Sequence, residues 1–168
     1  MDAYGEHMEF CQIQLNYIDY EFQEANKKIE YLNSKDIPIW VMEPIRGGKL
    51  ATISQAEVDS IRLKTTPCEL AFRFIHSIDG VCVTLSGMSD FEQVKDNIKT
   101  FEVFEPLNEK EFASTIELAR KMTSNVPCTS CRYCTEYCPQ GLDIPKLISL
   151  YNEFTFTGGG FIAPMYIS

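Results

Sequence analysis

The chain has 168 residues, a formal net charge of −9 and 45% hydrophobic residues. This composition is typical of a globular protein, and the acidic balance excludes nucleic acid as an expected partner. No apolar run reaches the roughly 18 residues that a membrane span needs. The N-terminus lacks the basic and then apolar order of a signal peptide, so we expect a cytoplasmic protein without a membrane span.

The first half of the chain predicts strands that alternate with helices. A strand is expected over 9–17, where apolar and polar side chains alternate, and a helix over 20–34, where apolar residues recur at helical spacing. A continuous apolar run over 37–42 predicts a buried parallel strand. Three helices should follow Ser54, Thr66 and Ser89, because each of these residues precedes a Glu by three positions, which is the pattern of a capping box.

The second half adds a short buried strand over 81–85, a helix that begins near residue 108 and a short helix over about 143–152. The complete order is strand–helix–strand–helix–helix–strand–helix–helix, which predicts an α/β fold with a parallel sheet. A parallel sheet of only three strands has two open edges and incompletely covered faces. We therefore expect these strands to form part of a larger domain.

Four of the seven cysteines form one motif, Cys128, Cys131, Cys134 and Cys138, with the spacing Cys-x2-Cys-x2-Cys-x3-Cys-Pro. This run is typical of [4Fe–4S] clusters in bacterial ferredoxins. Zinc sites usually combine two Cys-x2-Cys pairs across a long spacer, so a zinc site and an inert group of thiols are the alternatives. The spacing leaves open whether Cys138 ligates this cluster or a second one.

Five stretches, taken in order, carry a family resemblance over nearly the whole chain: FCQIQLNYID, PIWVMEPIRGGKLA, ELAFRFIHS, VTLSGMSDFEQVKDNI and CTSCRYCTEYCPQGLDIPKLISLYNE. They resemble the aldo/keto reductase family, and within it the branch with a C-terminal ferredoxin-type iron–sulfur domain. The resemblance implies that residues 1–106 are the last three βα units of a TIM (β/α)8 barrel. It implies that residues 107–168 are a helical linker and a [4Fe–4S] ferredoxin-type segment.

The resemblance also implies a function, namely an NAD(P)H-dependent oxidoreductase with an attached electron-transfer domain. Its expected partners are a small-molecule carbonyl or quinone substrate, or a redox partner protein. The family's catalytic Asp, Tyr, Lys and His come from strands that this sequence does not contain, and neither His7 nor His76 matches the catalytic histidine. We therefore expect no catalytic residue and an inactive chain. The alternative function is a small iron–sulfur electron carrier or adaptor without nicotinamide chemistry of its own.

The resemblance implies a set of cofactor-binding residues on and after the predicted strands: Gln12, Met42, Gly47, Gly48, Gly87, Met88 and Asn97. Gln12 would hold the nicotinamide carboxamide, although a hydrogen bond inside the barrel without any ligand is the alternative. The glycines would allow the backbone to approach the phosphates, and Asn97 would contact the adenine. The N-terminus of the helix after Ser89 should bind an anion through its free N–H groups. Gln93 stands where many NADPH-preferring members have a basic residue, which leaves NADH versus NADPH open.

Overall fold

The computed structural model describes residues 7–123, 126, 128 and 131–157. The chain packs as two compact units, Met1–Ala119 and Arg120–Ser168. The elements up to the second unit are, in chain order, β1 (Cys11–Gln14), α1 (Asp19–Phe22), α2 (Ala25–Asn33), β2 (Ile39–Met42), the 3-10 helix η2 (Lys49–Ala51), α3 (Gln55–Ser60), α4 (Pro67–His76), β3 (Val81–Thr84), α5 (Phe91–Glu102) and α6 (Glu109–Met122). This order confirms the predicted alternation of strands and helices.

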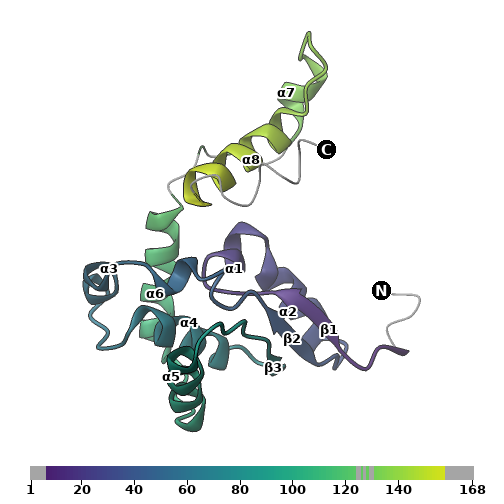
Figure 1. Ribbon diagram of the computed structural model, residues 1–168. Helices are drawn as coiled ribbons and strands as arrows, with labels where there is room; N and C mark the ends of the chain where they lie inside the picture. The colour runs from purple at the N-terminus through teal and green to yellow at the C-terminus, as the bar shows by residue number, and fades with distance from the viewer. Residues whose placement is uncertain (1–6, 124–125, 127, 129–130, 158–168) are drawn as a thin grey trace. The chain divides into compact units, whose positions relative to one another are not determined.

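The three strands form a parallel sheet in the order β1-β2-β3 (Figure 1). Cys11 is aligned with Ile39, and Ile39 with Val81, with a register shift after Ile39 in the second pairing. Parallel strands have their carboxyl ends at one edge of the sheet, so the loops that follow β2 and β3 leave it side by side. The candidate site lies on these two loops.

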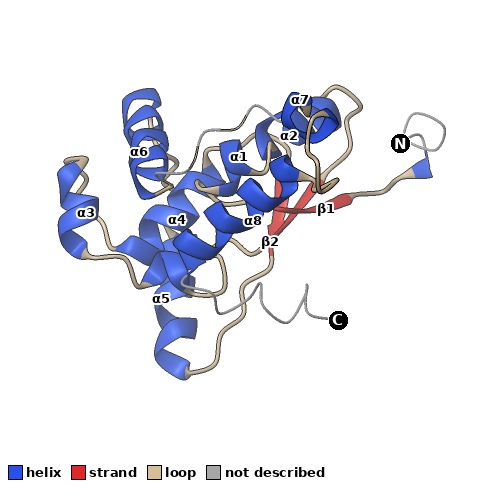
Figure 2. Ribbon diagram, turned by 90° about the horizontal axis from the view of Figure 1, so that it is seen from above, coloured by secondary structure: helices blue, strands red, loops and turns tan. Residues whose placement is uncertain are grey.

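The core of the first unit lies on one face of the sheet. Ile13, Ile39 and Val41 are buried, whereas Gln12 and Met42 point to the other face and are exposed. Helix α4 is the most buried helix, since every residue from Leu70 to Ile75 is buried. It contacts α3, α5 and β3, while α2 contacts β1, and Figure 2 shows α2 beside the strands. The alternation of buried and exposed side chains along the strands therefore shows which face of the sheet is covered.

Three local expectations need correction. The helix expected over 20–34 is two helices, because Glu24 has a left-handed backbone conformation with φ +53° between them. The first strand ends at Gln14, since the chain turns where the Asn16 side chain accepts hydrogen bonds from the two N–H groups that follow at positions 18 and 19. The strand expected to be buried over 81–85 is an edge strand of the described sheet, and Leu85 is 42% exposed.

The second unit contains α7 (Tyr133–Glu136) and α8 (Ile144–Thr157), which contact each other. Helix α8 includes most of the predicted 143–152 helix and extends beyond it. The Asn152 side chain donates to the carbonyl of Val126 at 3.0 Å and accepts from its N–H at 2.9 Å. Arg132 pairs with Asp143 at 3.0 Å. Among the described residues, we find no helix that is both long and apolar enough to cross a bilayer.

Candidate functional site

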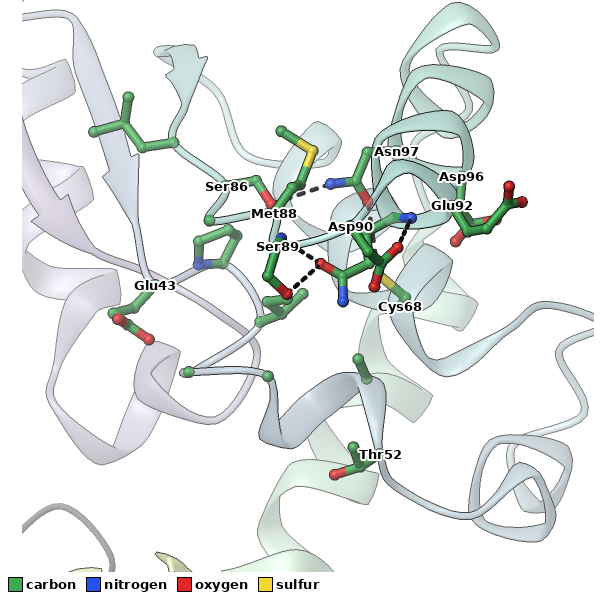
Figure 3. Close-up of a pocket in the computed structure, with 18 of the residues that line it drawn as sticks. Glu43, Thr52, Cys68, Ser86, Met88, Ser89, Asp90, Glu92, Asp96 and Asn97 are labelled. Carbon is green, nitrogen blue, oxygen red and sulfur yellow. Dashed lines mark hydrogen bonds between the residues drawn. The ribbon is translucent and has the colours of Figure 1, made fainter.

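The main cavity of the first unit, about 1080 Å³ in volume, lies at the carboxyl ends of β2 and β3 (Figure 3). Its walls are the loop after β2, the loop after β3 and the first turns of α5. Six of the seven predicted cofactor-binding residues line it: Met42, Gly47, Gly48, Gly87, Met88 and Asn97. In parallel α/β folds, ligands bind at this end of the strands. The structure thus brings together residues from two separate stretches of sequence.

Gln12 is the predicted residue that does not line the cavity. It is exposed on β1, and its side-chain amide donates to the Met42 sulfur at 3.1 Å. Met42 itself lines the cavity, so Gln12 contacts a lining residue from the side. This hydrogen bond corresponds to the alternative expected for Gln12, a contact within the protein. A role for Gln12 toward a nicotinamide stays a prediction.

The loop after β2 has an unusual backbone that presents two glycines to the cavity. Glu43, Arg46, Gly47 and Gly48 all have positive φ, between 49° and 86°. Side chains with a Cβ are strained in this region, and glycine is not, which explains the Gly-Gly pair. No other atom lies within 4 Å of the Cβ position above Gly48, so the space over this backbone is open.

A buried ion pair fixes this loop to the first residue of α1. Arg46 Nη2 lies 3.2 Å from Asp19 Oδ1, and its Nε donates to Asp19 Oδ2 at 3.2 Å. The same Oδ2 accepts from the amides of Gln14 at 2.8 Å and Asn16 at 2.7 Å. Asn16 also donates to the carbonyl of Glu43 at 3.0 Å, which ties down the first left-handed residue of the loop. This network was not predicted from the sequence, where Asp19 and Arg46 lie 27 positions apart.

The start of α5 differs from the expected one. The N-cap is Asp90 and not Ser89, because Asp90 Oδ1 accepts from the Gln93 N–H at 2.9 Å. The Gln93 side chain in turn accepts from the Ser89 N–H at 2.8 Å. The N–H groups of Ser89 and Gln93 are therefore occupied by the protein's own side chains. Anion binding by the other N–H groups of the first turn stays a prediction.

Asn97 and Cys68 form the wall of the cavity between α4 and α5. Asn97 donates from its amide to the Ser86 hydroxyl at 3.1 Å and lies 3.9 Å from the Cys68 sulfur (Figure 3). Burial, with the charge of Asp96 as a smaller cause, raises the pKa of the Cys68 thiol to about 11. Cys68 is therefore a protonated thiol at neutral pH and a poor nucleophile. Asn97 is the residue on this wall whose side-chain amide can form a hydrogen bond with a ligand.

The cysteine motif lies in the second unit. Cys128, Cys131 and Cys134 are exposed and Cys138 is half-buried. Among the described residues, no three metal-ligating side chains are gathered at one point, so the predicted metal centre stays a prediction. The Cys138 sulfur accepts a hydrogen bond from the Leu142 N–H at 3.4 Å. The set of four thiols has the donor chemistry that an iron–sulfur cluster requires.

Comparisons with known proteins find a similarity in fold, but no matching family model and no matching curated protein. A scan against protein-family models and a search of curated proteins both found no match. Two solved structures of the aldo-keto reductase AKR11C1 from Bacillus halodurans are similar to the chain. The holo form has a TM-score of 0.55 at 19% identity, and the apo form a TM-score of 0.54 at 18% identity.

Each match covers 70% of this chain, but only 45% of the holo and 46% of the apo reductase chain. The chain therefore spans less than half the length of the protein that it resembles. At this identity the similarity establishes the fold alone. The described α/β unit, with its three parallel strands, has the fold of part of an aldo-keto reductase barrel.

Proposed function

We propose that the chain is the C-terminal part of an NAD(P)H-dependent oxidoreductase of the aldo-keto reductase kind, with an attached [4Fe–4S] electron-transfer segment. The observation that carries the proposal is the placement of Met42, Gly47, Gly48, Gly87, Met88 and Asn97 around one cavity at the strand ends. This cavity occurs in a unit whose fold matches part of an aldo-keto reductase. A volume of about 1080 Å³ is large enough for a dinucleotide.

Within this proposal, the chain's own residues bind and orient the cofactor. The open backbone at Gly48 allows a phosphate group to approach closely, and the Asn97 amide can pair with the adenine edge. The bound cofactor would supply the hydride for reduction of a small carbonyl compound or quinone. The four cysteines of the motif would hold the cluster, which supplies one-electron transfer, and a redox partner protein is the other proposed electron acceptor or donor.

Cofactor binding is tested on the 168-residue chain by an NMR titration with NADH and NADPH. We expect saturable shifts of the backbone amides of Gly87, Met88 and Asn97, with weak affinity because few walls surround the ligand. Asn97→Ala should weaken binding about 5- to 30-fold, the effect of about 1–2 kcal/mol for a lost partner at a partly buried polar group. Asn26→Ala, on α2 and outside the cavity lining, is the matched control. Shifts scattered over the surface would contradict the proposal.

The cluster is tested by anaerobic reconstitution of the chain with iron and sulfide. We expect a brown protein with about four iron atoms per chain. Cys131→Ser should abolish iron binding, whereas Cys82→Ser, which alters an exposed cysteine on β3 outside the motif, should not. A colourless protein with one zinc per chain would contradict the assignment. Iron binding without any cofactor binding would favour an iron–sulfur electron carrier or adaptor.

A further inference from the structure

The charged side chains that line the cavity have one sign. Four carboxylates line it, Glu43 from the loop after β2 and Asp90, Glu92 and Asp96 from α5 and its cap. Among the described residues, no Lys, Arg or His lines the cavity. Figure 3 shows Glu43 on one side and the carboxylates near α5 on the other, with Ser86 and Met88 between them. A ligand in this cavity therefore meets negative charge on two sides.

The cations near the cavity do not line it, and this includes the exposed Lys49, which follows the lining residue Gly48 in the chain. Arg46 is buried against Asp19, and Lys95 pairs with the exposed carboxylate of Glu92 at 2.8 Å. Lys99 lines a separate cavity of about 160 Å³, which shares Asp96 with the main one. None of these cations is among the residues that face the main cavity. They therefore reduce the negative potential there only at longer range.

The start of α5 carries a carboxylate acceptor beside its first N–H groups. The N–H groups of Ser89 and Gln93 are taken by side chains, so they do not bind a phosphate. Asp90 uses only Oδ1 in its bond to Gln93, and among the described residues its Oδ2 has no hydrogen-bond partner. A carboxylate oxygen accepts from a ribose hydroxyl, as acidic residues do in NAD sites of other α/β folds.

We propose that the cavity selects NADH over NADPH, because its carboxylates accept from a free ribose 2′-hydroxyl and repel a 2′-phosphate. The inference rests on the proposed function and specifies its cofactor. A phosphate monoester carries about −1.5 to −2 charges at neutral pH. Each carboxylate at about 8 Å in a largely aqueous cavity then weakens its binding about two- to fivefold. With several carboxylates acting together, we expect NADH to bind at least about tenfold more tightly than NADPH.

The test compares NADH and NADPH titrations of the same 168-residue chain by NMR at low and at high salt. The preference for NADH should shrink as salt rises, because screening reduces the repulsion of the 2′-phosphate more than it affects the hydroxyl contact. Equal or tighter binding of NADPH would overturn this inference and leave the proposed function intact. Failure of both cofactors to bind would overturn the inference and the proposed function together.

Substitutions of single carboxylates show which of them cause the preference for NADH over NADPH. Asp90→Asn removes a charge but keeps a side chain that caps helices well, so α5 should remain folded. We expect this variant and Asp96→Asn to tighten NADPH binding about two- to fivefold each relative to NADH. Glu102→Gln, at the other end of α5 and outside the cavity lining, makes the same change in net charge and should leave the ratio unchanged. An equal change in all three variants would show a net-charge effect and overturn the inference.

Discussion

Replacing Arg46 by Met should destabilise the first unit, because it leaves the carboxylate of Asp19 buried without its cation. Asp19 has no exposed surface and Arg46 is only 7% exposed, so water does not compensate for the lost partner. Removing one member of a buried ion pair costs about 3–5 kcal/mol. The amides of Gln14 and Asn16 still donate to Asp19, so we expect the lower end of this range, about 3 kcal/mol.

The assay is urea unfolding followed by far-ultraviolet circular dichroism. With a slope of about 1.5 kcal/mol per molar urea, the midpoint should fall by about 2 M. The double variant Arg46→Met with Asp19→Asn should recover much of this loss, because the amide carries no charge and its oxygen still accepts from Gln14 and Asn16. Lys95→Ala is the control, since it removes a pair whose side chains are 56% and 81% exposed and should leave the midpoint unchanged.

A midpoint for Arg46→Met that equals the Lys95→Ala midpoint would refute the reasoning. It would mean that the Asp19 carboxylate reaches water at little cost. A double variant that is less stable than Arg46→Met alone would also refute it, since the buried charge would then not be the source of the loss. The two variants together separate the cost of an unpaired charge from the cost of a lost contact.

Two further predictions concern α4 and the histidine at its end. Thr66→Ala removes the observed capping box of α4 and should lower stability by about 1 kcal/mol in the same urea assay, whereas an unchanged midpoint would contradict the cap's role. Burial of His76 beside Phe101 and Phe104 lowers its pKa, so the unfolded chain binds the proton more readily. Its contribution to stability should be constant above pH about 6.5 and be lost as pH falls toward the lowered folded pKa. Thermal unfolding across this range, with His76→Gln as the variant that flattens the profile, measures the effect.

The elements that could be predicted are those with local causes. The first strand follows from alternation and the other two from short apolar runs, and two of the three expected capping boxes are present, at Ser54 and Thr66. At the third, Ser89 and Asp90 are both good N-caps with a suitable residue three positions later, so the pattern alone does not choose between them. An apolar run such as 81–85 likewise does not distinguish a central strand from an edge strand.

The features that could not be predicted depend on contacts between distant residues. The Asp19–Arg46 pair joins positions 27 apart, and its burial depends on how β1 and β2 lie against each other. The break at Glu24 lacks a Gly or Asn, the residues that usually mark a left-handed conformation. The cofactor residues were found through the family resemblance, and the placement of six of them around one cavity agrees with that prediction without testing their role.

The three strands lie in the sheet in the same order as in the chain, and this affects how the first unit folds. Each strand pairs with the one made just before it, so a growing chain can add β2 to β1 and then β3 to β2 without opening an existing pair. Of the described strands, β2 is the one with neighbours on both sides, so its amides should exchange with solvent most slowly. The order in which the sheet forms during synthesis and the position of its slowest-exchanging amides would then both depend on β2, Ile39–Met42.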